Sequence, residues 1–393
     1  MVILGIETSC DETAAAVLQK QGNRITILSN VVASSASLQA KYGGIIPEQA
    51  AREQIKSIIP VIAEAIEQAF PNVIPANAGI QLTKSGSELD PRLRGDDRIK
   101  NIDAIAVTYG PGLIGSLLVG VETAKVLATI WQKPLIPVNH LIGHFYANWI
   151  ADATPKFPCI GLLVSGGHTD LVLFTDHGKY KYLGGTRDDA AGECFDKCAR
   201  LLGLPYPGGP EIARLAQTGD PTIYKLPSPL IDSKDFDFSF SGLKTAVSNL
   251  FRSDKTLVQA TEVQPVADSH LIRAKRFERP DQAHEGALAD LAASIEQAII
   301  NVLVEKTVRA VQTYNIPQVM VAGGVAANQA LSSMLRKKIS RVPVFTRSVA
   351  LLIPPPALCT DNGAMIASAA FFEKPLKNPL DLQADPNLSL YNH

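Results

Sequence analysis

A short pattern occurs twice in this sequence and limits the folds that are open to it. The first copy spans residues 2–18 and the second spans residues 159–174. In each copy an apolar run enters a turn of hydroxyls, glycines or carboxylates, and a second apolar run follows. The copies are about 155 residues apart, which predicts two similar α/β halves facing each other across a cleft. Two unrelated hairpins would be the simpler alternative.

Strand and helix patterns alternate along the rest of the chain, which favours the α/β class. We expect further strands at residues 102–107, 135–138 and 319–322, and helices at residues 47–70, 116–131, 285–313 and 361–371. The helix at 285–313 is predicted to be amphipathic, and Pro60 is expected to kink the helix at 47–70.

The composition supports a globular chain without a strong charge signal. The 393 residues are 46% apolar and 19% charged, and the formal net charge is −1, so a nucleic-acid partner would need a local basic patch. Because the sequence has no uncharged apolar run of about 18 residues and no basic leader, we predict neither a membrane span nor a signal peptide. Five scattered cysteines argue against a disulfide framework and fit the cytoplasm. Cys194 and Cys198 are read as two thiols on one helix face rather than half a metal site.

Two segments are rich in charge and poor in periodicity. We interpret residues 75–100 as a surface insertion that is neutral for the chemistry. Residues 253–285 read as a variable solvated loop, although their basic cluster leaves contact with RNA as an alternative. The tail after Pro375 is expected to be a loosely packed loop.

The strongest local signal for chemistry is the pair His140 and His144. A spacing of four places both imidazoles on one face of a helix, where they can share one metal ion. The residue after the first histidine is Leu141, so the glutamate base of a zinc protease is missing. A third ligand must come from elsewhere, and from the residues alone Asp361 is equally well explained as a ligand or as a helix N-cap.

Three glycine turns lie beside predicted strand or helix ends, at residues 165–167, 207–210 and 323–328. Glycine lets a ligand's phosphate or ring approach the backbone closely. None of them is a G-x-G-x-x-G fingerprint, but together they point to a nucleotide cleft.

Ten stretches, taken together and in order, resemble the tRNA N6-adenosine threonylcarbamoyltransferase family (TsaD), whose older name is glycoprotease. They are GIETSCDET (5–13), KYGGIIPE (41–48), PGLIGSLLVG (111–120), NHLIGH (139–144), LVSGGHT (163–169), GECFDK (192–197), YPGGP (206–210), FSFSGLKT (238–245), AGGVAAN (322–328) and CTDNGAMI (359–366). The resemblance covers residues 2–370 apart from 81–100 and parts of 253–285, and GGIIPE is similar to the bacterial branch.

The resemblance implies a fold of the actin/Hsp70/sugar-kinase (RNase H-like) type, with two duplicated α/β halves around a central cleft. The halves are expected at residues 1–138 and 139–350, followed by a C-terminal helix and tail at 351–393 whose helix packs back near the cleft. The implied activity is acyl transfer in tRNA modification. The threonylcarbamoyl group of threonylcarbamoyl-adenylate moves to N6 of adenosine 37 in tRNAs that read codons starting with A, and AMP leaves. The implied partners are tRNA, an inactive paralogue and a small ATPase, with no membrane.

The resemblance also assigns residues. One divalent metal ion, iron or alternatively zinc, is expected on His140, His144 and Asp361. Contacts with the substrate and with an adenine nucleotide in the cleft are expected at Leu163, Val164, Ser165, Gly166, Gly167, Asp196, Gly209 and Asn328.

Two positions of the N-terminal half qualify this assignment. Glu12 is our candidate for proton handling or for ordering the acceptor, with a solvated turn carboxylate as the alternative. Gln54 stands where family members often have histidine, so any acid/base or stacking role of that histidine is in doubt here, although we expect function to be kept.

Three other kinds of protein are alternatives to this activity. An ATP-hydrolysing kinase or chaperone of the same fold would not need a histidine pair, and a non-catalytic scaffold paralogue would be expected to lack the metal ligands. A metalloprotease is disfavoured by Leu141.

Overall fold

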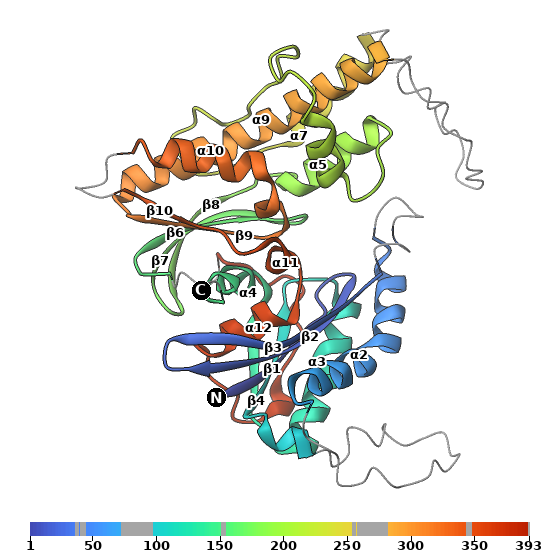
Figure 1. The fold of residues 1–393 in the computed structure, drawn as a ribbon, viewed down its shortest axis with the longest axis vertical. Helices are drawn as coiled ribbons and strands as arrows, with labels where there is room; N and C mark the ends of the chain where they lie inside the picture. Colours follow the sequence, from blue (N-terminus) through green and yellow to red (C-terminus); the bar gives the residue numbers. More distant parts are fainter. Residues whose placement is uncertain are drawn as a thin grey trace.

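The computed structural model describes residues 1–35, 39, 45–71, 97–150, 155–253, 257, 282–342 and 348–391. In these residues the chain forms two five-stranded sheets, one above the other in Figure 1. The strands of the first sheet are β1 (Val2–Glu7), β2 (Glu12–Gln21), β3 (Arg24–Ser34), β4 (Ala104–Gly110) and β5 (Leu135–Asn139). Those of the second are β6 (Cys159–Val164), β7 (Thr169–Asp176), β8 (Lys179–Gly185), β9 (Gln318–Ala322) and β10 (Ala350–Leu352).

The two sheets have the same topology. The first has the order β3-β2-β1-β4-β5 and the second, read from its other end, β8-β7-β6-β9-β10. In each, three consecutive strands form an antiparallel meander, and two later strands extend the sheet in parallel. The earlier of these two pairs with the first meander strand, and the last strand of the sheet pairs with it. The prediction of two duplicated α/β halves is therefore confirmed.

Helices cover the outer faces of both sheets (Figure 1). On the first sheet these are α2 (Pro47–Ala69) and α3 (Ile114–Trp131). On the second sheet they are α5 (Ala191–Leu201), α6 (Gly208–Ala216), α7 (Ser241–Ser253), α9 (Gln282–Tyr314) and α10 (Gln329–Ile339). Short 3-10 helices occur at Asp97–Asn101, Ala147–Trp149, Gly324–Ala327 and Pro379–Asp381.

Three short helices lie between the two sheets: α4 (His140–Tyr146), α11 (Pro356–Cys359) and α12 (Gly363–Ala370) (Figure 1). α12 contacts β1 and β2 of the first sheet, and α4 contacts β6 and β9 of the second. α4 and α12 also contact each other. Because α12 is built almost entirely of small residues, it fits closely against the first sheet.

Glycines allow this close fit. A Cβ on Gly363 would lie 2.5 Å from the backbone nitrogen of Ala16, and a Cβ on Gly143 would lie 2.7 Å from Cδ1 of Ile366. No side chain could be accommodated at either position without a shift of the backbone or of the packed neighbour. The sequence therefore brings the start of α4 and the start of α12 together between the halves.

Several expectations need correction. α9 is buried around most of its circumference rather than amphipathic, because the other helices of the second half pack on it. The tail is packed rather than loose, since Leu382 and Leu390 are buried and the Asp385 amide donates to the Tyr109 carbonyl oxygen at 2.7 Å. β3 and β8 were not predicted. α2 continues through Pro60, and the kink expected there stays a prediction.

The charge-rich segments lie largely outside the described residues. Of the insertion at 75–100, the structure describes only 97–100, where Ile99 is buried in the first half. Of residues 253–285, Ser253, Leu257 and the start of α9 are described, and Leu257 is buried. Neither expectation about these segments is tested.

Two helices are long and apolar enough to cross a membrane by length and composition alone. In α9 the stretch Gly286–Tyr314 is 72% buried inside the fold, as expected for a core helix. In α3 the stretch Ile114–Trp131 is 44% buried, which leaves one face of that helix open. All five cysteines are free, and Cys194 and Cys198 are buried on α5.

Candidate active site

The three predicted metal ligands lie together at the facing ends of α4 and α12. His140 and His144 are on α4, whose N-cap is Asn139, with its side-chain oxygen accepting from the Leu141 amide at 2.8 Å. Asn362 caps α12 by accepting from the Met365 amide at 2.9 Å. Asp361 is therefore not the N-cap, and its carboxylate is available to the histidines.

The geometry of this group suits one ion. Oδ1 of Asp361 lies 3.2 Å from Nε2 of His144 and 3.7 Å from Nε2 of His140. One donor atom from each of the three side chains falls within 4.8 Å of the other two. Two imidazoles and one carboxylate are a common donor set for zinc and for non-haem iron(II), with positions left for substrate or water.

The polar atoms of His144 give an independent test of this fit. The residue is 1% exposed, and its Nδ1 is buried without a hydrogen-bond partner among the described residues. Its Nε2 is buried as well and faces Oδ1 of Asp361 at 3.2 Å. Buried polar atoms without a partner are rare, and a ligand to be bound is one of their explanations. The donor set and the buried imidazole of His144 together indicate that a metal ion fits here.

The charges of the group interact strongly. Burial lowers the pKa of His140, but the carboxylates of Glu7 and Asp361 outweigh it and raise the pKa to about 9. Burial would raise the pKa of Asp361, yet the two histidines hold it well below its ordinary value. Burial, reinforced by the charges of His140 and His144, lowers the pKa of His168 to about 4. The site thus keeps an anionic carboxylate facing two imidazoles, with a neutral third histidine nearby.

Glu12 borders this group from the first turn. Burial and the negative charges of Asp361 and Asp11 raise the pKa of Glu12 to about 9. The turn itself is clamped by Gln54 of α2, which is 1% exposed and donates from Nε2 to the carbonyl oxygens of Cys10 (3.1 Å) and Glu12 (2.8 Å). The amide at position 54 is therefore a structural clamp that needs no titration.

A hollow of about 330 Å³ adjoins the same turn. It opens between the start of β2, the end of β3 and α2, and most of its lining residues bear a hydroxyl or a charge. They are Asp11, Thr13, Ala33, Ser34, Ser35, Glu53, Lys56 and Ser57.

The glycine turns of the second half converge at one edge of its sheet. β6 and β9 are parallel neighbours, so Leu163 and Val164 end beside Ala322. Gly323 has a φ of 89°, and a Cβ there would lie 2.4 Å from the Val164 carbonyl oxygen. The Gly192 amide at the start of α5 donates to the Ser165 carbonyl at 3.1 Å. Ligands bind α/β sheets at this carboxyl edge of the parallel strands.

Among the remaining predicted nucleotide contacts, the two glycines of the 165–167 turn are open, whereas Asp196 and Asn328 are already engaged within the chain. Gly166 and Gly167 face open space, with nothing within 4 Å of an added Cβ. Asp196 accepts from the Gly208 amide at 2.7 Å, beside Gly209 at the start of α6. Asn328 caps α10 and donates to Glu296 at 2.7 Å. Their contacts with a nucleotide stay a prediction.

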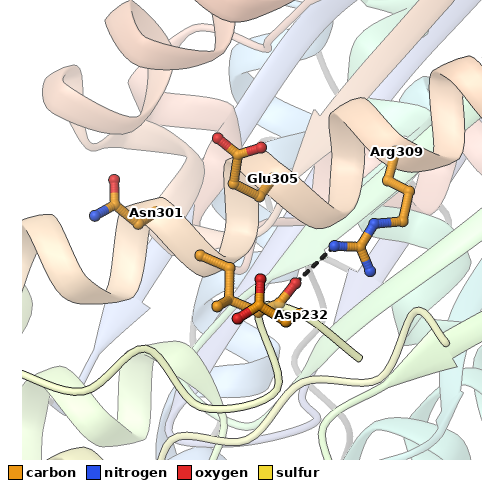
Figure 2. A pocket seen from close by; sticks show the side chains of 5 residues that line it. Asp232, Asn301, Glu305 and Arg309 are labelled. Atoms are coloured by element: carbon orange, nitrogen blue, oxygen red, sulfur yellow. Dashed lines mark hydrogen bonds between the residues drawn. The ribbon is translucent and has the colours of Figure 1, made fainter. Parts of the chain in front are cut away.

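A separate hollow of about 340 Å³ lies on the second half, between α9 and the loop that connects α6 to α7 (Figure 2). Arg309 donates there to the carbonyl oxygen of Ile231 at 2.6 Å, and Glu305 pairs with Lys338. None of the residues predicted for the site lines this hollow.

Sequence reasoning missed the residues behind the metal ligands. Glu7 is fully buried and contacts His140, while Thr108 of β4 donates to Glu7. The signal for Glu7 was its place as the last residue of the apolar strand VILGIE. An acidic side chain is rarely buried without a partner, so a functional role could have been inferred there. His168 was missed as well, although it directly follows the glycine turn at residues 165–167.

Two duplicated α/β halves with a metal-ligand group between them define the class of the protein: an actin-like fold carrying a two-histidine, one-carboxylate centre. The solved structure of HypF from T. kodakarensis shares the fold, with a TM-score of 0.51 at 15% identity over 94% of this chain and 46% of that one.

Sequence comparison places the chain within that class. The model of the family described as tRNA N6-adenosine threonylcarbamoyltransferase matches residues 26–75 and 96–368. The enzyme of that name from Thermomicrobium roseum is 46% identical over 398 residues, covering 99% of this chain and 97% of that one. The Bacillus cereus enzyme is 42% identical over 391 residues, covering 99% and 96%. The chain belongs to the tRNA N6-adenosine threonylcarbamoyltransferase family.

Proposed function

We propose that the protein transfers the threonylcarbamoyl group from threonylcarbamoyl-adenylate to N6 of adenosine 37 in tRNAs that read codons starting with A. AMP is the leaving group. The observation that carries this proposal is the His140, His144 and Asp361 group between the halves of a chain that belongs to this family. A kinase or chaperone of the same fold would have no use for that group, and a scaffold paralogue would not be expected to keep it.

The reaction makes two demands on the site. The donor is a mixed carbamic–phosphoric anhydride with a good leaving group, but the acceptor amine is weak because its lone pair is delocalised into the purine. The enzyme must therefore hold donor and acceptor in line and stabilise the charge that develops on the donor carbonyl.

The metal site supports the second demand. His140, His144 and Asp361 would hold one divalent ion, and a bound ion supplies a Lewis acid for the donor carbonyl. We propose Fe²⁺ as the native ion, with Zn²⁺ as the alternative, because the donor set suits both.

The chain's own residues support the first demand. The Ser165–Gly167 turn leaves open space above its backbone, where amide groups can meet the phosphate of the adenylate. Asp196 of α5, which accepts from the Gly208 amide at the start of α6, is proposed to bind a ribose hydroxyl, and Asn328 to contact the nucleotide. Glu12 is proposed to accept the N6 proton or to order the acceptor, because a carboxylate with a raised pKa is a stronger base once ionised.

A transfer assay tests the proposal. The purified chain and its partner proteins receive labelled threonylcarbamoyl-adenylate and a tRNA that reads a codon starting with A, and the digested nucleosides are analysed by mass spectrometry. Threonylcarbamoyl-adenosine should form with this tRNA and not with a matched tRNA that carries guanosine at position 37. No modified nucleoside with either tRNA, from folded metal-loaded protein, would favour the kinase-like or scaffold alternative.

We further propose that the open face of α3 binds the inactive paralogue. Ile114, Leu118, Val126 and Ile130 follow one another at spacings of four or eight and are 44–49% exposed. Exposed apolar side chains that line up on one helix face are typical of interaction surfaces. The small ATPase partner and the cytoplasmic location rest on the family resemblance and, for the location, on the five free cysteines.

Substitutions on this face test the partner. Leu118→Glu and Val126→Glu should abolish co-elution with the purified paralogue while leaving the melting temperature of the chain unchanged. Ile223→Glu is the control, because Ile223 is also an exposed apolar side chain, at 57%, but lies in the second half. Co-elution that survives both α3 substitutions would contradict this surface.

A further inference from the structure

Glu7 is a buried carboxylate for which the transfer reaction gives no explanation. It is the last residue of β1, and its exposed fraction is 0%. Oε1 accepts from the Ser9 amide at 2.6 Å, and Oε2 accepts from the Thr108 hydroxyl. Oε2 also lies 3.2 Å from Nδ1 of His140. An ionised carboxylate survives in such a place only when hydrogen bonds and a positive charge compensate for its lost hydration.

We propose that Glu7 is a positioning residue of the metal centre. It accepts the Nδ1 proton of His140 and so directs the Nε2 lone pair of that ring to the ion. It also supplies the negative charge that makes a divalent ion tolerable between the halves. This inference rests on the metal site of the proposed function and adds a residue that does not touch the ion or the substrate.

The ring geometry supports the positioning role. Only one nitrogen of an imidazole can ligate an ion, and the hydrogen bond of the other nitrogen decides which. In His140, Nδ1 faces Glu7 and also lies 3.2 Å from the Ser9 hydroxyl, whereas Nε2 faces Asp361 at 3.7 Å. The carboxylate, the turn and the ring therefore form one connected unit.

The second histidine shows the contrast. Nδ1 of His144 is buried without a hydrogen-bond partner among the described residues. Only the His140 ring is held from behind by a carboxylate, so the two ligands differ in how firmly they are oriented. The loss of Glu7 should consequently act through His140 alone.

Charge balance supports the electrostatic role. A divalent ion with two neutral imidazoles and the Asp361 carboxylate has a net charge of +1, in a site where His140 and His144 are both buried. Glu7 brings this total to zero. In the described part of the chain, the ion pair made by Glu7 is the one with His140, so no lysine or arginine already neutralises it there.

Metal affinity, measured without tRNA or donor, tests the inference. Zn²⁺ is titrated against a chromogenic chelator into the full chain, into Glu7→Gln, and into Glu64→Gln, a matched carboxylate-to-amide control on the exposed side of α2. We expect Glu7→Gln to bind Zn²⁺ about 10- to 100-fold more weakly and the control to match the parent. An unchanged affinity in Glu7→Gln would overturn the inference.

Two further measurements keep the test decisive. If Glu7→Gln does not fold, Thr108→Val, which keeps the carboxylate but removes one hydrogen bond to it, should still weaken Zn²⁺ binding, and parental affinity would overturn the inference. In the parent, ¹⁵N NMR of the Zn²⁺ form should show His140 protonated at Nδ1. Protonation at Nε2 would overturn it.

The outcomes separate this inference from the proposed function. If the parent chain transfers nothing to tRNA but Glu7→Gln still weakens Zn²⁺ binding, the proposed function is contradicted and the role of Glu7 is supported. A parent chain that binds no Zn²⁺ and no Fe²⁺ would overturn the metal site and the role of Glu7 together.

Discussion

A Cβ placed on Gly5 would lie 2.4 Å from the carbonyl oxygen of Gly363, so β1 and α12 touch backbone to backbone. This contact fixes the start of α12, and with it Asp361, over the first sheet. The metal-ligand group thus depends on two glycines that carry no chemistry of their own.

Gly363→Ala should therefore damage both stability and metal binding. The new Cβ would meet the Ala16 backbone nitrogen at 2.5 Å, and α12 would have to move. We expect a loss of about 1–3 kcal/mol in the free energy of unfolding, measured with urea, together with weaker Zn²⁺ binding. Gly286→Ala is the control, because nothing lies within 4 Å of its Cβ position in α9. It should stabilise the helix by about 0.5–1 kcal/mol, and equal effects of the two substitutions would contradict this account.

Asp170 predicts a pH-dependent stability. Burial raises its pKa to about 6, although the Tyr182 hydroxyl donates to it at 3.0 Å and opposes the shift. A carboxyl whose pKa is raised in the folded state stabilises the fold below its unfolded pKa of about 4 and loses that contribution as the pH rises through about 6. Asp170→Asn stays neutral and should be more stable than the parent by about 1–3 kcal/mol at pH 7. Urea unfolding at pH 4 should show no such gain, and a gain of the same size at both pH values would refute the assignment.

At position 54 we expect stability and activity to depend on hydrogen bonds from the side chain and not on a group that titrates. Gln54→Ala removes both bonds to the carbonyl oxygens of Cys10 and Glu12, which should cost about 1–3 kcal/mol of stability and lower the transfer rate. Gln54→His keeps a donor and should retain a rate within about tenfold of the parent, which corresponds to about 1.4 kcal/mol. Transfer rates and urea unfolding curves of both variants check these expectations. A Gln54→Ala chain as active and stable as the parent would remove the clamp from the account.

We expect the charged insertion to be dispensable for activity and stability up to residue 96, but not beyond it. Deleting residues 81–96 should leave transfer activity and unfolding largely unchanged. Extending the deletion to Lys100 removes Ile99, which is buried and whose carbonyl oxygen accepts from the Ile102 amide at 3.1 Å. Loss of that side chain should cost about 2–5 kcal/mol. A large loss of activity in the shorter deletion would contradict the neutral role.

The sequence was sufficient to predict the duplicated halves, because the two copies of the strand–turn–strand pattern are buried central strands with clear periodicity. It was insufficient for β3 and β8, which are edge strands whose partly exposed residues carry polar and charged side chains. Edge strands bury only part of their surface, so their apolar alternation is weak.

The two histidines of the metal-ligand group could be predicted from the sequence, whereas the role of Asp361 stayed ambiguous. A spacing of four on one helix is a local property, and it gave His140 and His144 directly. The choice between cap and ligand for Asp361 depended on Asn362 taking the cap, which only the conformation of the turn decides. Glu7 lies more than 100 residues before both His140 and Thr108, its two side-chain neighbours here, so no local pattern could reveal this contact.

The metal dependence of transfer tests the central claim most directly. The chain is stripped with a chelator, and single-turnover transfer to tRNA is measured before and after Fe²⁺ or Zn²⁺ is restored, in the parent and in His140→Ala. The account predicts that the stripped parent loses transfer, that a divalent ion restores it, and that His140→Ala is inactive in every state. Full transfer by a stripped parent, or by His140→Ala, would show that this group is not the centre of the reaction.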